Sequence, residues 1–151
     1  MNRRFVLNAL AALSLPLALP SMAAPALPQV HVFKSPYCGC CGAWVDHLKA
    51  AGFAVKVTEV GDTTAARKRL GIPDKFGICH TATVAGYVLE GHVPADEVKR
   101  LLAEKPKALG LAVPGMPPSS PGMDVPGRTD PYDVFLIAQN GQESVYAHYP
   151  K

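Results

Sequence analysis

The sequence predicts a mixed α/β domain, and three observations lead to that prediction. Segments with strand-like alternation of apolar residues take turns with segments whose apolar residues recur at helical spacing. A Cys-x-x-Cys pair, Cys38 and Cys41, lies where the first strand-like segment gives way to the first helix-like segment. A Pro/Gly-rich stretch then precedes a last pair of strand-like segments, which predicts a C-terminal extension that ends in a β-hairpin.

Residues 1–23 have the features of a secretory signal peptide. A pair of arginines at positions 3 and 4 precedes an apolar run, Phe5–Leu19, that is too short to span a membrane, and small residues favour cleavage after Ala23. Removal would leave residues 24–151 as one domain and lower the formal net charge from +3 to +1. We therefore expect a soluble, periplasmic monomer without membrane insertion and without the basic surface that nucleic-acid binding needs.

The first part of the domain is predicted to alternate strands and helices. Gln29–Lys34 and Ala54–Val60 have the composition of strands. A helix should begin within the cysteine cluster and end at Gly52, and a short helix capped by Asp62 or Thr63 should run to Leu70. The apolar face of the first helix is predicted from four residues at helical spacing: Cys41, Trp44, Val45 and Leu48.

The second part is predicted to hold a hairpin, a helix and a long loop. Thr81–Val84 and Tyr87–Glu90 flank a tight turn, and a helix should start at Pro94. In residues 106–131, 11 of 26 residues are proline or glycine, so we expect a long loop without regular structure. Residues 132–151 should form the terminal hairpin around an Asn-Gly turn.

This order of elements is that of thioredoxin-like domains. In that class the first cysteine of the pair, here Cys38, lies at a helix N-terminus, where unpaired backbone N–H groups lower the pKa of the thiol. Cys41 would be its resolving partner, so Cys38 and Cys41 are the candidate catalytic residues if the site is redox active. Cys40, between them, has no role in that chemistry, and Cys79-His80 stands where thioredoxins place a proline.

Three interpretations of the four cysteines remain open. They could form structural disulfides, since four cysteines allow three pairings. Cys38 and Cys41 could serve a thiol–disulfide oxidoreductase, which leaves Cys40 and Cys79 unexplained. A soft-metal site uses all four thiols, and this interpretation is favoured because the fold should bring Cys79, with His80, beside the other three.

Two methionines favour copper over zinc. Met116 and Met123 lie in similar Gly-Met units of the Pro/Gly-rich loop, and a thioether is a ligand for Cu(I). His80 is a candidate ligand or a neighbour of one, and His148 is a weaker candidate. The remaining three histidines are expected at the surface or, for His92, in a turn. No paired carboxylates, phosphate-binding loop or nucleophilic serine motif occurs, so hydrolytic chemistry has no support.

Several segments of the chain resemble the CopG-like copper-resistance proteins of Gram-negative bacteria. The resemblance rests on Ser35–Cys41 with its Cys-x-Cys-Cys motif, and on four further segments, and it extends over nearly the whole of residues 30–148. The further segments are Cys79–Ala82, Gly86–Pro94, Gly110–Pro117 and Ser120–Met123.

This resemblance implies a thioredoxin-like domain whose C-terminal extension helps to bind metal. It implies a cysteine-bridged copper cluster and a role in interconverting Cu(I) and Cu(II) during copper detoxification. We therefore expect a periplasmic Cu(I)-binding protein that serves a copper efflux system; the alternatives are a thiol–disulfide oxidoreductase and a passive Cu(I) chaperone. The expected metal ligands are Cys38, Cys40, Cys41, Cys79, Met116, Met123 and His80.

Overall fold

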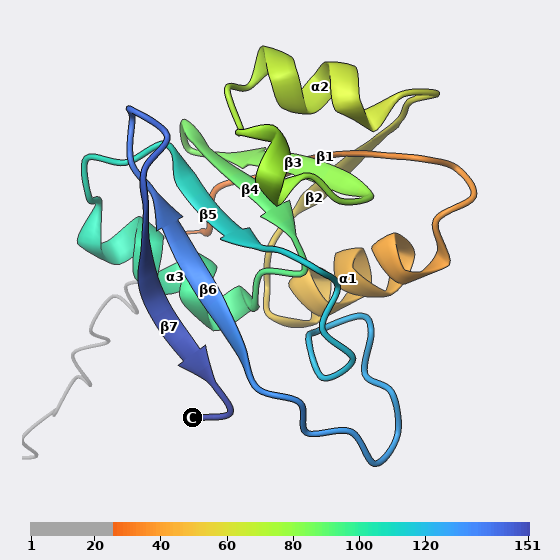
Figure 1. Ribbon diagram of the computed structural model, residues 1–151. Coiled ribbons are helices and arrows are strands. Elements are labelled where there is room, and N and C mark those ends of the chain that lie inside the picture. Colours follow the sequence, from red (N-terminus) through yellow and green to blue (C-terminus); the bar gives the residue numbers. More distant parts are fainter. Residues whose placement is uncertain (1–25) are drawn as a thin grey trace, which may run out of the picture.

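A computed structural model describes residues 26–151, and the predicted signal peptide lies outside this range. Within it, seven strands form a single sheet in the order β2-β1-β3-β4-β5-β6-β7, accompanied by three α-helices (Figure 1). None of the helices in this part of the chain is long and apolar enough to cross a membrane. The helical elements are α1 (Gly39–Ala50), α2 (Thr63–Arg69), the 3-10 turn η1 (Asp74–Phe76) and α3 (Ala95–Glu104). The strands are β1 (Val30–Lys34), β2 (Val55–Glu59), β3 (His80–Val84), β4 (Tyr87–Gly91), β5 (Gly110–Val113), β6 (Tyr132–Ile137) and β7 (Glu143–Tyr149).

The sheet is mixed. Strands β1 and β2 pair in parallel, as do β4 and β5, whereas the other four neighbouring pairs are antiparallel. The parallel pairs require crossovers, which α1 and α3 supply, and the antiparallel pairs β3–β4 and β6–β7 are joined by short turns. Because of this order, the N-terminus of β3 lies beside the C-terminal ends of β1 and β4.

Helices cover both faces of the sheet. The larger core packs the apolar faces of α1 and α3 against one face, with Trp44, Leu48, Leu89 and Leu101 fully buried. The smaller core lies on the other face, where Ile72 and residues of η1 and β4–β6 pack together. The buried residues of α1 are Cys41, Trp44, Val45 and Leu48, which confirms the face that the sequence predicts.

One expectation about the loop is wrong. Residues 106–131 were expected to lack regular structure, but β5 lies within them, buried between β4 and β6. A Cβ atom on Gly110 would lie 1.7 Å from the carbonyl oxygen of Val88, so the close strand pairing there requires glycine. The proline and glycine content of this segment conceals a strand, and the parts without regular structure are residues 106–109 and 114–131.

Candidate metal centre

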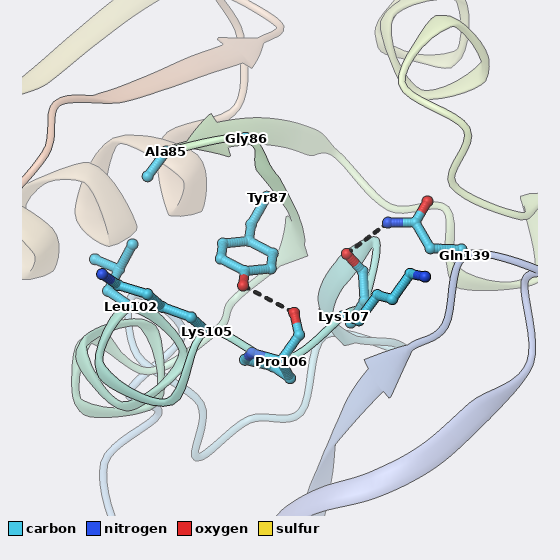
Figure 2. Close-up of a pocket in the computed structure, with 9 residues that line it drawn as sticks. Ala85, Gly86, Tyr87, Leu102, Lys105, Pro106, Lys107 and Gln139 are labelled. Carbon is cyan, nitrogen blue, oxygen red and sulfur yellow. Dashed lines mark hydrogen bonds between the residues drawn. The ribbon is translucent and has the colours of Figure 1, made fainter.

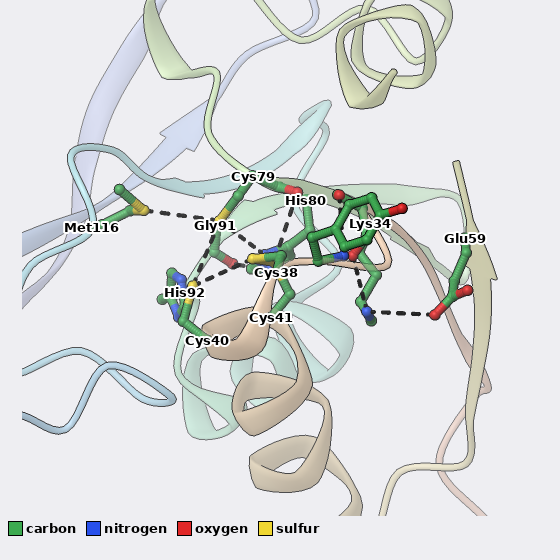
Figure 3. The surroundings of a disulfide bond; sticks show 12 residues. Lys34, Cys38, Cys40, Cys41, Glu59, Cys79, His80, Gly91, His92 and Met116 are labelled. Atoms are coloured by element: carbon green, nitrogen blue, oxygen red, sulfur yellow. Dashed lines mark hydrogen bonds and ion pairs between the residues drawn. A yellow bond between two sulfur atoms is a disulfide. The ribbon is translucent and has the colours of Figure 1, made fainter. Parts of the chain in front are cut away.

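The turn between β3 and β4 borders a pocket of about 340 Å³ that carries little chemistry (Figure 2). Its lining includes Tyr87, Lys105, Lys107 and Gln139, and the hydroxyl of Tyr87 donates to the carbonyl of Pro106 at 2.8 Å. No cysteine, histidine or acid lines this pocket. The reactive side chains lie at the opposite end of β3 and β4, around Cys79 (Figure 3).

Cys38 is the residue that caps the N-terminus of α1, in extended conformation, and it is disulfide-bonded to Cys41. Cys41 is fully buried in the first turn of the helix, whereas Cys38 and Cys40 are half-buried. The thiol of Cys40 lies 3.4 Å from Cys38 Sγ. The predicted low pKa of Cys38 therefore concerns the reduced state, since a disulfide sulfur carries no proton.

Cys79 comes between η1 and β3 and joins the cysteines of α1. Its Sγ lies 4.0 Å from Cys40 Sγ, and its carbonyl oxygen lies 3.7 Å from Cys41 Sγ. The ligand atoms of all four cysteines lie within 4.8 Å of one another. Burial, and next the neighbouring Cys40, raise the pKa of the Cys79 thiol to about 12. Metal binding would therefore have to displace a proton from this thiol.

Met116 brings a fifth sulfur to this group. The Cys79 thiol donates to Met116 Sδ at 3.9 Å, and Met116 is 40% exposed (Figure 3). Met116 has a φ of 47°, in the left-handed region, and the preceding Gly115 also has a positive φ. The backbone therefore turns sharply just after the end of β5. Met123, half-buried in the same loop, makes no such sulfur contact within residues 26–151.

The loop that carries both methionines packs against the start of α1. Gly122 has a φ of 84°, and a Cβ atom there would lie 2.6 Å from the backbone nitrogen of Trp44. Only glycine allows this close approach. The loop residue Pro121 also accepts a hydrogen bond from His92 through its carbonyl oxygen, at 2.8 Å.

His80 is fully buried beside Cys79, and its hydrogen bond decides its tautomer. Nε2 lies 3.0 Å from the carbonyl oxygen of Gly91, which can only accept, so Nε2 carries the proton. Nδ1 is then unprotonated, and it lies 3.8 Å from Cys79 Sγ. Burial, followed by the neighbouring His92, lowers the pKa of His80 to about 3, so the imidazole is neutral at physiological pH.

His92 supplies a second bare imidazole nitrogen. Its Nδ1 must be the donor to the carbonyl of Pro121, which leaves Nε2 unprotonated. Nε2 is buried and has no hydrogen-bond partner. Burial lowers the pKa of His92 as well, and ligand atoms of Cys79, His80 and His92 lie within 4.8 Å of one another.

A buried carboxylate holds the backbone on both sides of Cys79. Glu90 Oε1 accepts from the Ile78 N–H at 2.9 Å, and Oε2 accepts from the Thr81 hydroxyl at 2.5 Å. Arg67 Nη1 lies 3.7 Å from Oε1, while Arg67 Nε has no partner. Burial nevertheless raises the pKa of Glu90. Glu90 therefore fixes the residues that flank Cys79 and His80.

Three other histidines lie away from this centre. His148, a weaker candidate ligand, pairs with Asp133 at 2.7 Å on β6–β7. His31 shares a hydrogen bond with Thr58, and His47 is half-buried and accepts from the N–H of Ala95 at the start of α3. Among the remaining sequence candidates, the structure brings Cys38, Cys40, Cys41, Cys79, His80 and Met116 together.

Sequence reasoning missed two residues of this region. His92 was expected to be a turn residue but is fully buried against His80, with ring centroids 5.1 Å apart. Glu90 was assigned only to a hairpin strand, although it is fully buried. The sequence offered one indication of their burial, since each is a polar residue between apolar positions at the end of a strand. The same pattern is equally typical of a strand end that is exposed to solvent.

The donor set suits a soft metal ion. Thiolates and thioethers favour Cu(I), and neutral imidazoles also bind copper and zinc. In each histidine one ring nitrogen donates to a backbone carbonyl and leaves the other unprotonated, which is the usual support for a metal-binding imidazole. The partnerless Nε2 of His92 is satisfied if a metal ion lies there.

Two of three comparisons with known proteins found matches. A family of proteins of unknown function, DUF411, matches residues 76–123. Two solved structures, "Copper resistance protein copG- Form 2" and "Form 1", have TM-scores of 0.78 and 0.77 and are 43% and 42% identical. The matches cover 82% and 83% of this chain and 99% of each of the two solved chains. The comparison with curated protein sequences found no significant match.

The identity of these matches exceeds 40%, and they cover most of this chain and nearly the whole of each solved chain. The chain therefore belongs to the CopG family of copper-resistance proteins.

Proposed function

We propose that this protein binds copper in the periplasm and contributes to copper resistance. The observation that carries the proposal is the convergence of four cysteine sulfurs, one thioether and two neutral imidazoles around Cys79. The copper-resistance proteins that share 42–43% of its sequence support the same metal. Copper is here the cargo of the protein, and Cys38, Cys40, Cys41, Cys79, His80, His92 and Met116 are the proposed ligands.

The disulfide must open before all four cysteines can bind metal. Reduction of Cys38–Cys41 consumes two electrons and two protons and yields two further thiols. Four thiolates in one small volume would carry four negative charges, which the interior tolerates only if they are paired. Several Cu(I) ions bridged by thiolates would provide that pairing, and we propose such a cluster.

The donor set also suits a change in the oxidation state of copper. Thiolate and thioether sulfur favour Cu(I), whereas imidazole nitrogen also binds Cu(II). His80 and His92 lie next to the sulfurs and are neutral at physiological pH, so both kinds of donor are available at one place. We propose that the protein interconverts Cu(I) and Cu(II): oxidation of the Cys38 and Cys41 thiols to their disulfide releases two protons and two electrons, which would reduce two Cu(II) to Cu(I), and the reverse reaction would oxidise two Cu(I). We further propose that it supplies copper to a periplasmic efflux system.

A thioredoxin-like origin accounts for the position of the cysteines. The sheet order β2-β1-β3-β4, with β1 and β2 parallel and β3 antiparallel to both neighbours, is consistent with that class, and Cys38 caps α1 as its first cysteine would. Residues 106–151 would then be an extension of this domain. Export by a signal peptide over residues 1–23 remains part of the proposal.

A thiol–disulfide oxidoreductase is the second candidate, and the Cys38–Cys41 disulfide at the N-terminus of α1 favours it. A passive Cu(I) chaperone would use the same ligands without turnover. The oxidation state of the released copper distinguishes the chaperone from the first proposal. A chaperone releases copper in the oxidation state in which it was bound, whereas the first proposal requires that this state changes.

Copper retention by the reduced protein tests the proposal. The protein is reduced, loaded with Cu(I), desalted, and assayed for copper and for free thiols. We expect more than one copper per chain and protection of all four thiols. Cys40→Ser should lower the copper content while it leaves Cys38 and Cys41 able to form their disulfide. Unchanged copper content in Cys40→Ser would contradict the cluster.

A further inference from the structure

We propose that Cys40 and Cys79 are a second redox pair, which exchanges with the Cys38–Cys41 disulfide, so that one disulfide moves among four cysteines. The sulfurs lie in a row: Cys41 is bonded to Cys38, Cys38 Sγ lies 3.4 Å from Cys40 Sγ, and Cys40 Sγ lies 4.0 Å from Cys79 Sγ. Cys40 thus touches both the disulfide and the remaining free thiol. Figure 3 shows the four side chains facing one another from α1 and from the start of β3.

Each step of the exchange is balanced. A thiolate attacks a disulfide sulfur and displaces the other sulfur. The Cys40 thiolate attacks Cys38 Sγ, the bond to Cys41 breaks, and Cys41 takes up the proton that Cys40 released. The Cys79 thiolate then attacks Cys40 Sγ, the Cys38–Cys40 bond breaks, and Cys38 takes up the proton that Cys79 released. One disulfide and two thiols are present before and after, so no external oxidant or reductant is consumed.

The exchange moves the disulfide outward. Cys41 is fully buried, whereas Cys40 and Cys79 are half-buried and Cys79 contacts the exposed Met116. A disulfide between Cys38 and Cys41 includes one fully buried cysteine, whereas a disulfide between Cys40 and Cys79 joins two half-buried cysteines, of which Cys79 contacts Met116. The proposed exchange gives Cys40 a role. Thiol–disulfide chemistry that uses only Cys38 and Cys41 gives Cys40 no role. The proposal requires no copper and so stands apart from the proposed function.

Peptide mapping distinguishes the two disulfides directly. Trypsin releases residues 35–49, which contain Cys38, Cys40 and Cys41, and residues 76–99, which contain Cys79. A Cys38–Cys41 disulfide stays within the first peptide, whereas a Cys40–Cys79 disulfide joins the two. The protein with one disulfide is incubated with a copper chelator, quenched with acid, alkylated and digested. We expect both the internal disulfide and the joined peptides, with the unpaired cysteines alkylated.

Two variants control the assignment. In Cys40→Ser the joined peptides should fall to background while the internal disulfide remains. In Cys38→Ser/Cys41→Ser, oxidised glutathione should form the Cys40–Cys79 disulfide within one chain and release two molecules of reduced glutathione. Circular dichroism checks that both variants fold. The proposal is overturned if the wild type yields only the internal disulfide, or if the joined peptides persist in Cys40→Ser.

Discussion

Two groups of buried polar side chains lie next to Cys79 and differ in how their atoms are paired. Both carboxylate oxygens of Glu90 accept hydrogen bonds, from Ile78 and Thr81. On the other side, the tautomers of His80 and His92 leave a bare nitrogen on each ring, and Nε2 of His92 has no partner. Burial of an unpaired polar atom costs free energy, and a metal ion bound to this nitrogen would offset that cost.

The difference separates structural from functional residues. Glu90 stabilises the fold around Cys79, since both of its carboxylate oxygens accept hydrogen bonds from within the fold. We assign His92 and Cys79 to the proposed copper site instead, because Nε2 of His92 has no hydrogen-bond partner and the thiol of Cys79 belongs to both groups of candidate ligands. Substitutions on the two sides should therefore have different effects, on stability for Glu90 and on copper binding for Cys79 and His92.

The largest expected effect is that of Cys79→Ser. Cys79 belongs to both groups of candidate ligands, the one with the other three cysteines and the one with His80 and His92. Loss of this thiolate should weaken Cu(I) binding by more than roughly 100-fold, which exceeds the effect of removing a supporting residue. Competition with a Cu(I) chelator measures the change. Wild-type affinity in a folded Cys79→Ser protein would exclude Cys79 from the site.

His92→Gln should weaken copper binding about 10- to 100-fold. The matched control is His148→Gln, because His148 lies on β7 and pairs with Asp133 away from the cysteines. The control should bind copper as the wild type does. Urea unfolding of the metal-free proteins should show that His92→Gln changes stability far less than it changes copper affinity. Equal copper affinities of the two variants would remove His92 from the ligand set.

Glu90→Gln should instead destabilise the metal-free protein by about 1–3 kcal/mol, because an amide cannot accept from both Ile78 and Thr81. Urea unfolding measures this loss. Glu104→Gln is the control: Glu104 is exposed and bonded to Arg100 and Tyr146, so its replacement should lower the stability far less than Glu90→Gln does. Similar losses in both variants would mean that Glu90 does not hold the Cys79 segment.

The smallest effect is expected for Met116→Leu. A side chain of similar volume keeps the packing, so stability should change by less than about 1.5 kcal/mol, while the thioether contact with Cys79 is lost. Met123→Leu, in the same loop, is the matched control. Copper should dissociate faster from Met116→Leu than from Met123→Leu. The rate of copper transfer to a chelator measures this difference. Identical transfer rates would mean that the loop sulfur does not bind copper.

Local patterns in the sequence predict much of this fold. The apolar spacing of Cys41, Trp44 and Leu48 predicts the buried face of α1, and Asp62 caps α2 as expected through a 2.8 Å bond to the Thr64 N–H. Strand β5 was missed because glycine and proline around it indicate a loop. The reason for Gly110, a close contact with Val88, is visible only once the two strands are paired.

The site was predictable where the sequence marks it with rare residues. Three cysteines in four positions, and a fourth beside His80, are informative without a structure. His92 is not, because its meaning depends on burial and on Pro121, which lies 29 residues further along the chain. The same holds for Glu90, whose partners reach it only through the pairing of β3 with β4 and the packing of α2.

X-ray absorption at the copper edge of the loaded, reduced protein tests the central claim most directly, because it identifies the atoms bound to the metal. We expect a shell dominated by sulfur with a nitrogen contribution, and a smaller nitrogen contribution in His92→Gln. A shell of oxygen and nitrogen without sulfur would contradict the assignment of the cysteines as copper ligands.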